Sequence, residues 1–170
     1  RIPELELRME GPSLSRGDRV DASEHVDFSS PKLPPSMVFV RTPVHGSWSL
    51  RKRPGFLRLR GQPASLSDLA SPALVCRRQQ HFDMAARTRL TFEPLGANEQ
   101  AGLCVRANEQ FHVALHVTAG ERGRELRLVR TLAGRRTTLG RMRLASGPVA
   151  LEVSATAEEY VFHGGAGRLL

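Results

Sequence analysis

The feature that most constrains this chain is the period of its apolar residues, which is two rather than 3.6. From residue 37 onward, apolar and polar side chains alternate over short runs, a pattern typical of strands buried on one face. The longest run covers residues 82–92, where Arg87 and Arg89 share one face. The other, apolar face carries Phe82, Met84, Ala86, Leu90 and Phe92. We expect a long, half-buried strand here.

The same test predicts strands at intervals of about ten residues along the rest of the chain. The predicted strands are Met37–Arg41, Phe56–Arg60, Ala73–Arg78, Phe82–Phe92, Ala101–Arg106, Phe111–Val117, Glu125–Leu132, Thr138–Leu144, Val149–Val153 and Glu159–His163. Turn signals such as Ala107-Asn108-Glu109-Gln110 and Ala133-Gly134 separate them. No segment has an amphipathic helix pattern longer than about two turns. The sequence therefore predicts an all-β fold, an antiparallel sandwich or jelly roll.

The length of 170 residues suits one domain and is too short for two of full size. Residues 1–26 are rich in turn-forming and acidic residues, and we interpret them as an inter-domain linker that precedes a domain over 27–170. The sequence begins at Arg1 without an apolar leader, so we interpret it as part of a longer, cytoplasmic polypeptide. No run approaches the roughly 20 apolar residues of a membrane span, and we expect no membrane partner.

The basic residues raise nucleic acid as a partner, because the formal net charge is +8. Lysine occurs only at Lys32 and Lys52, however, and the 23 arginines are scattered along the chain. Many of them alternate with apolar residues, as on the outward face of a half-exposed strand. A solvated face explains most of this charge, so a nucleic-acid-binding β domain is an alternative that we do not favour.

Two pairs of residues are candidates for chemistry. Cys76 and Cys104 each lie in an apolar run, and we favour two small buried thiols over a disulfide or a metal pair. His112 and His116 have a spacing that could bind one zinc ion on a helix. On a strand they would share a face but stand about 13 Å apart, too far to hold one ion together. We expect both to be polar outward residues, with contact to a sugar as the alternative.

Nothing in the sequence argues for catalysis by this chain. Hydrolysis of a glycoside needs two carboxyl groups on opposite walls of a cleft, whereas the closest acids here are neighbours in turns. The serines lack a Gly-x-Ser-x-Gly elbow, and the glycines near residue 165 lack the Lys-Ser/Thr pair of a phosphate loop. With aromatic residues at 5%, a free-standing carbohydrate-binding module with stacking platforms is a second alternative rather than the preferred interpretation.

Several ordered motifs between residues 27 and 103 resemble one protein family. They are Asp27–Leu33, Arg41-Thr42-Pro43, Gly46-Ser47-Trp48-Ser49-Leu50, Arg53–Gly61, Leu74–Phe82, Thr88–Phe92 with Pro94, and Asn98–Leu103. Together they resemble the C-terminal concanavalin A-like sandwich of glycoside hydrolase family 43 β-xylosidases and α-L-arabinofuranosidases. The resemblance implies a concanavalin A-like jelly-roll β-sandwich. It also implies a catalytic β-propeller in the same polypeptide, which would hold the catalytic carboxylates and act on xylo-oligosaccharides.

The resemblance carries further expectations for particular residues. Family members continue past the position of Phe162 with more strands, so we expect the sandwich of this chain to be truncated at its C-terminal strands. No cofactor is expected for the chain itself, although calcium in the complete parent protein would use a residue that matches Asp27. Five consecutive long polar residues are expected to face the propeller or its pocket: Arg77, Arg78, Gln79, Gln80 and His81.

Overall fold

The computed structural model describes residues 23–165 and 167–168, and this part of the chain contains strands and no helix. The strands are β1 (Met37–Phe39), β2 (Trp48–Ser49), β3 (Arg58–Leu59), β4 (Val75–Arg77), β5 (Met84–Leu90), β6 (Ala101–Arg106), β7 (His112–Gly120), β8 (Gly123–Leu132), β9 (Arg135–Arg143), β10 (Val149–Ala155), β11 (Tyr160–Gly164) and β12 (Gly167–Arg168). Each predicted strand has a counterpart, whereas β2 and β12 were not predicted. Within the described part, no helix is long and apolar enough to cross a membrane.

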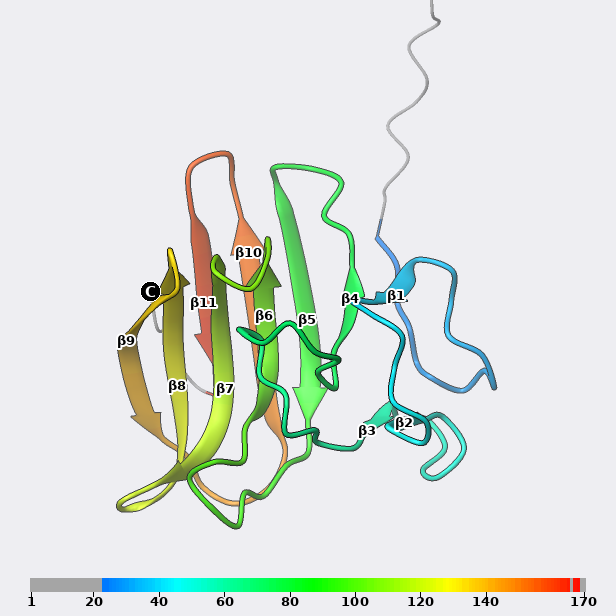
Figure 1. The fold of residues 1–170 in the computed structure, drawn as a ribbon, viewed down its shortest axis with the longest axis horizontal. Coiled ribbons are helices and arrows are strands. Elements are labelled where there is room, and N and C mark those ends of the chain that lie inside the picture. The colour runs from blue at the N-terminus through cyan, green and yellow to red at the C-terminus, as the bar shows by residue number, and fades with distance from the viewer. Residues whose placement is uncertain (1–22, 166, 169–170) are drawn as a thin grey trace, which may run out of the picture.

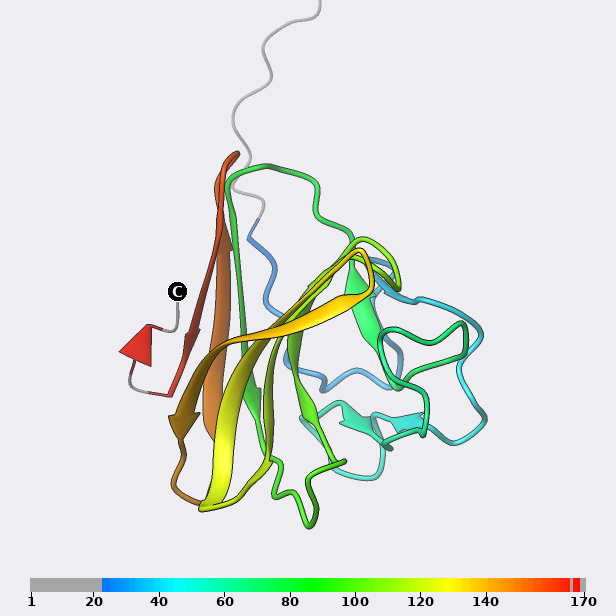
Figure 2. The same cartoon turned by 60° about the vertical axis from the view of Figure 1, so that its left-hand side comes forward.

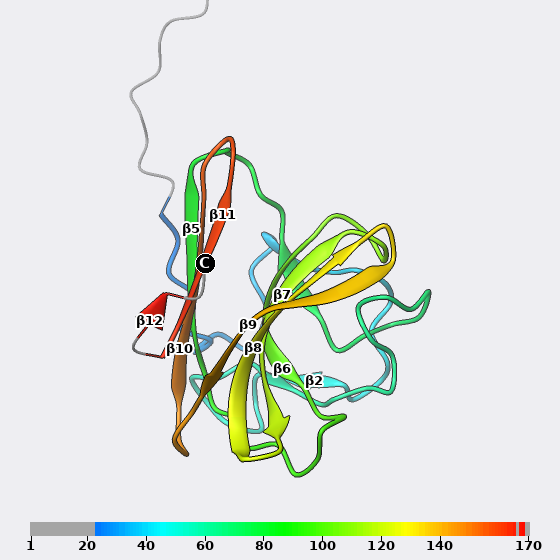
Figure 3. The same cartoon turned by 90° about the vertical axis from the view of Figure 1, so that its left-hand side faces the viewer.

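Two four-stranded antiparallel sheets form the body of the domain (Figure 1). One sheet has the order β12-β11-β10-β5, and the other has the order β6-β7-β8-β9. The two sheets lie face to face, as the turned views show (Figures 2 and 3). Tight turns connect the long strands: Ala133 and Gly134 join β8 to β9, both with positive φ, as a two-residue turn of type I′ requires. The fold is therefore the predicted β-sandwich.

The core lies between the middle strands of the two sheets. It is contributed by the inward faces of β7 and β8 on one side and of β10 and β11 on the other. Its buried members are Leu115, Val117, Leu126, Leu128, Val149, Leu151, Val153 and Phe162. Because every second residue of these strands is apolar, burying one face of each sheet removes most of this surface from water.

The strand β5 is shorter and more exposed than predicted. Phe82 lies before the strand and is 75% exposed, so its assignment to the buried face was wrong. Ala86 pairs with the buried Val153 and therefore shares the inward face, yet it is exposed as well. The reason is that β5 is the edge strand of its sheet, and its other edge has no partner among the described strands. Coverage by the opposite sheet fades toward this edge.

Two smaller pairs of strands, β1 with β4 and β2 with β3, lie to one side of the main sheets, next to β5 and β6 (Figure 1). Residues 1–22 of the predicted linker lie outside the described residues, and 23–26 form no strand. The N-terminal end of the described chain lies against this side, because Glu24 forms an ion pair with Arg77 of β4 at 2.7 Å.

Candidate functional site: the outer face of the second sheet

The face of the β6–β9 sheet that points away from the core is polar, and its residues align in rows across all four strands. Antiparallel pairing places side chains of neighbouring strands side by side on one face. We call one set the His112 row: Arg106, His112, Thr131 and Arg136. We call the other the His116 row: Gly102, His116, Arg127 and Arg141. Small or apolar residues lie between the rows: Cys104, Ala114, Val129 and Thr138.

Both histidines point away from the sandwich core, as expected of outward polar residues, but both are buried on this outer face rather than exposed. His112 is 9% exposed and His116 is 5% exposed. The His112 ring Nδ1 lies 3.4 Å from the carbonyl oxygen of Asn108. The Nε2 atom of His116 is buried and has no hydrogen-bond partner among the described residues. Their shared face agrees with the alternation along the strand, and a role in sugar contact stays a prediction.

The surroundings of the two histidines favour the neutral imidazole. Burial lowers the pKa of His116 to about 4, and the nearby guanidinium groups of Arg136 and Arg127 add to this effect, against a smaller opposing influence of Glu125. Burial also lowers the pKa of His112, with Arg106 and Arg136 acting in the same direction. At neutral pH both rings are therefore uncharged and can donate through one nitrogen and accept through the other.

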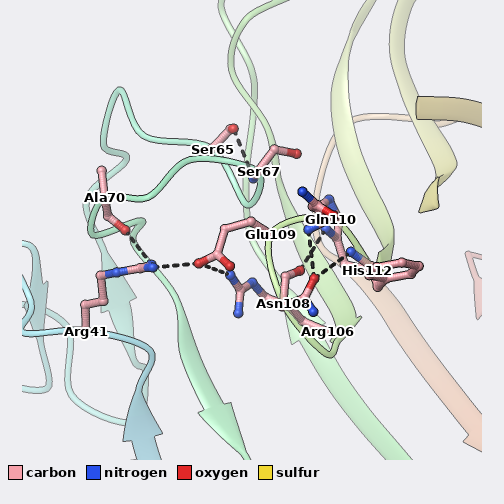
Figure 4. Close-up of polar contacts among 10 residues, drawn as sticks. Arg41, Ser65, Ser67, Ala70, Arg106, Asn108, Glu109, Gln110 and His112 are labelled. Carbon is pink, nitrogen blue, oxygen red and sulfur yellow. Dashed lines mark hydrogen bonds and ion pairs between the residues drawn. The ribbon is translucent and has the colours of Figure 1, made fainter. Parts of the chain in front are cut away.

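An ion-pair cluster of Arg41, Arg106 and Glu109 connects one end of this sheet to the β1–β4 side of the domain (Figure 4). The Glu109 carboxylate receives Arg41 Nη2 at 2.6 Å and Arg106 Nη2 at 2.8 Å. The second terminal nitrogen of Arg41, Nη1, donates to the carbonyl oxygen of Ala70 at 3.0 Å. The two arginines hold the pKa of Glu109 down at about 2. The turn signal at 107–110 was visible in the sequence, but its partner Arg41, 68 residues away, was not.

The predicted docking segment, Arg77 to His81, runs from the end of β4 into the connection to β5, and its five residues are exposed. Gln79 is held at both ends of its amide: its Nε2 donates to the carbonyl oxygen of His81 at 2.8 Å, and its Oε1 accepts from the Tyr160 hydroxyl at 2.8 Å. The segment is therefore an exposed polar surface tied to the start of β11. Its predicted role at a domain interface stays a prediction at this point.

The cysteines are free thiols, half-buried on β4 and β6. Burial raises the pKa of Cys76 and raises that of Cys104 to about 12. A thiol with a raised pKa is a poor nucleophile and a poor metal ligand, because both reactions need the thiolate. The interpretation as small structural thiols agrees with this environment.

Asp27 lies in an exposed turn, where its Oδ1 accepts the backbone N–H of Ser29 at 2.9 Å and the Ser29 hydroxyl at 2.8 Å. These hydrogen bonds lower the pKa of the carboxyl group. Calcium is bound by about six to eight oxygen ligands. The described residues contain no group of three or more acidic, histidine or cysteine side chains that could hold a metal ion. A role of Asp27 in calcium binding stays a prediction.

Comparison with known proteins agrees with this architecture. Residues 25–166 match the family described as the β-xylosidase C-terminal concanavalin A-like domain. A non-reducing end α-L-arabinofuranosidase of Bacteroides ovatus is 35% identical over 137 residues, 80% of this chain and 26% of that protein. A xylan 1,3-β-xylosidase of a Vibrio species is 34% identical over 69% of this chain and 22% of its own length.

Solved structures show the same relation. The crystal structure of a xylan β-1,4-xylosidase from Bacillus halodurans superposes with a TM-score of 0.81 at 33% identity, over 92% of this chain and 30% of that one. The chain thus spans between about a fifth and a third of the length of these proteins. Sequence and fold agree with one assignment: the chain belongs to the family of C-terminal concanavalin A-like domains of β-xylosidases.

Proposed function

We propose that this domain is the accessory, non-catalytic sandwich of a family 43 glycoside hydrolase that acts on xylo-oligosaccharides in the cytoplasm. In this proposal a catalytic propeller of the same polypeptide precedes the domain, and the domain supports the propeller and its substrate pocket. Two facts support it: the family is named for a C-terminal position, and the relatives are about three times as long as this chain.

The observation that carries the docking part of the proposal is the ion pair between Glu24 and Arg77. It places the first described residues of the chain beside the exposed segment Arg77–His81. A domain that precedes this one in sequence would therefore be joined to the sandwich on the side of that segment. Two exposed rings lie next to it, Phe82 at 75% and Tyr160 at 42%. Exposed aromatic side chains next to arginine are the composition that protein interfaces favour.

The test uses the parent polypeptide with the double substitution Arg77→Ala and Arg78→Ala. Loss of these side chains should lower hydrolysis of an aryl β-xyloside and separate the unfolding of the two domains in calorimetry. The matched control is Arg58→Ala with Arg60→Ala, two exposed arginines of the β3 segment. Unchanged kinetics and an unchanged melting profile in the Arg77/Arg78 variant would refute docking through this segment.

The proposal also requires that the isolated chain does not hydrolyse glycosides, since acid–base hydrolysis needs two positioned carboxyl groups. Purified chain is assayed on aryl xylosides and aryl arabinofuranosides, and no turnover is expected. Turnover that survives repurification and disappears when one acid of this chain is replaced would show that the domain itself is catalytic.

A further inference from the structure

The strand β9 forms an open edge of the β6–β9 sheet. Among the described strands it pairs with β8 alone, and no backbone hydrogen bond joins residues 135–143 to another described segment. In Figure 1 β9 lies on the left-hand side of the domain, opposite β4. An edge strand has free N–H and C=O groups along one side, and an extended segment of another chain can pair with them. A further strand can therefore be added at β9.

Four arginines make this edge strongly cationic. All four are exposed, and none forms an ion pair within the described part of the chain: Arg135, Arg136, Arg141 and Arg143. The strand β9 itself contains no acidic residue. The acid opposite it on β8, Glu125, is already paired with Arg127. The edge therefore carries four positive charges that no described carboxylate neutralises.

The other open edge, β5, has much less free charge. Arg87 is paired with Glu152, with 2.9 Å between Nε and Oε2. Asp83 immediately precedes the strand and adds a negative charge. Arg89 is the one arginine of β5 without an ion pair in the described part of the chain. Of the two open edges, β9 is the one suited to an anionic partner.

Charge and backbone chemistry together select the occupant of the β9 edge. A second copy of β9 would place four arginines against four more, and like charges on neighbouring strands repel. A nucleic acid would neutralise the arginines, but it has no row of amide groups for the free backbone, and β9 has no aromatic side chain on which its bases could stack. An extended acidic peptide meets both needs, because its amides pair with the edge and its carboxylates with guanidinium groups.

The register of β9 gives the pattern of charge that such a peptide needs. Arg136, Arg141 and Arg143 share the outer face of the sheet. Residues on one face of a strand repeat every second position, about 6.6 Å apart. We propose that β9 binds, by strand addition, an extended peptide of a partner protein with acidic side chains at alternate positions, which lie beside these three arginines. The site is independent of the docking proposed above, because β4 and β9 lie on opposite sides of the domain (Figure 1).

The test is titration calorimetry of this chain with four probes. They are an octapeptide of alternating glutamate and threonine, the same peptide with lysine in place of glutamate, the glutamate peptide N-methylated at two adjacent central amides, and an eight-nucleotide oligothymidylate. Neighbouring amides of a strand point to opposite sides, so one methyl group always blocks the paired side while the charge is unchanged. The glutamate peptide should bind, the N-methylated peptide at least about tenfold more weakly, and the lysine peptide not at all.

Amide exchange and substitutions locate the site. Bound glutamate peptide should slow exchange of the β9 amides in NMR spectra and leave those of β5 unchanged. Arg136→Ala and Arg141→Ala should each weaken binding by about two- to fivefold, as expected for one exposed ion pair, and binding should weaken with added salt. Arg58→Ala, at an exposed arginine of β3, is the matched control and should leave binding unchanged. Each variant is first shown by its NMR spectrum to keep the wild-type fold.

Five results would overturn the inference: no binding of the glutamate peptide, equal binding of the N-methylated or the lysine peptide, slowed exchange at β5 instead of β9, tighter binding of oligothymidylate through the same arginines, or a dimer of the free chain that already protects the β9 amides. Failure of the proposed function is detected separately, because the Arg77/Arg78 experiment in the parent polypeptide does not involve β9.

Discussion

Acidification from pH 7.5 to pH 5 is expected to destabilise this domain through its buried histidines, of which His116 has the larger pKa shift. The imidazole is buried on the outer face of the β6–β9 sheet, and its pKa falls from 6.5 to about 4 on folding. The groups that act on it are Arg136 and Arg127, which oppose protonation, and Glu125, which favours it. Between these two pKa values the unfolded chain binds a proton that the folded chain does not. The free energy of unfolding therefore falls as the pH falls through this window.

The magnitude follows from the size of the shift. One pKa unit corresponds to 1.36 kcal/mol, so the full effect below pH 4 is about 3 kcal/mol. At pH 5 the loss relative to pH 7.5 is about 2 kcal/mol, a sizeable share of the roughly 5–15 kcal/mol by which single domains are stable. Glu109 does not interfere in this range, because the stabilisation from its lowered pKa is present above pH 4.5 and is lost only as the pH falls toward about 2.

The assay is urea unfolding followed by circular dichroism at pH 7.5, 6 and 5, for the wild type and for His116→Gln. Glutamine cannot take up the proton, and the substitution breaks no hydrogen bond of Nε2 with a described residue. The variant should therefore lose about 2 kcal/mol less than the wild type between pH 7.5 and 5. His45→Gln, at an exposed histidine, is the matched control and should behave like the wild type. Equal losses in wild type and His116→Gln would refute the reasoning.

Three further substitutions test the packing. Leu115→Ala should lower the free energy of unfolding, measured in urea, by about 2–5 kcal/mol because the side chain is completely buried. Leu95→Ala, at a residue 93% exposed, should change it by less than about 0.5 kcal/mol. Similar losses in the two variants would contradict the assignment of the core. Gly102→Ala should disrupt the pairing of β6 with β7, since a Cβ there would lie 2.0 Å from a backbone oxygen, and Gly61→Ala, which meets nothing within 4 Å, is its control in thermal melts. Glu109→Gln should lower the melting temperature at pH 7, and less so in high salt, because it removes the anion shared by two arginines. An unchanged melting temperature would show that the ion-pair cluster does not stabilise the domain.

The sequence predicted the strands well because each long strand buries one face, and a period of two reports that face directly. β6 was predicted with its observed bounds, Ala101–Arg106, and ten of the observed strands had a predicted counterpart. The failures have the same physical origin. Alternation shows which residues share a face but not what covers it, so Phe82 and Ala86 were placed in the core although they lie at the open β5 edge.

His112 and His116 show the converse error. Both rings point away from the core, as a polar residue opposite an apolar face should, yet both are buried on the outer face. Histidine favours neither burial nor exposure strongly, so composition does not resolve this point. The two arginines that help lower the pKa of His116, Arg127 and Arg136, come from β8 and β9, and their distance in sequence concealed them.

The polar rows of the outer face depend on register, which the turns between the strands fix. Arg106 and Arg136 stand 30 positions apart in the sequence and become members of one row only because each hairpin between them has a defined length. Since side chains alternate between faces, a shift of one residue in the pairing of β8 with β9 beside the turn would turn Arg136 toward the core side. Arg141, five residues further on, shares its face only because the pairing shifts register between Leu128 and Val129. The two-residue turn at Ala133-Gly134 is thus as much a determinant of the cationic surface as the arginines themselves.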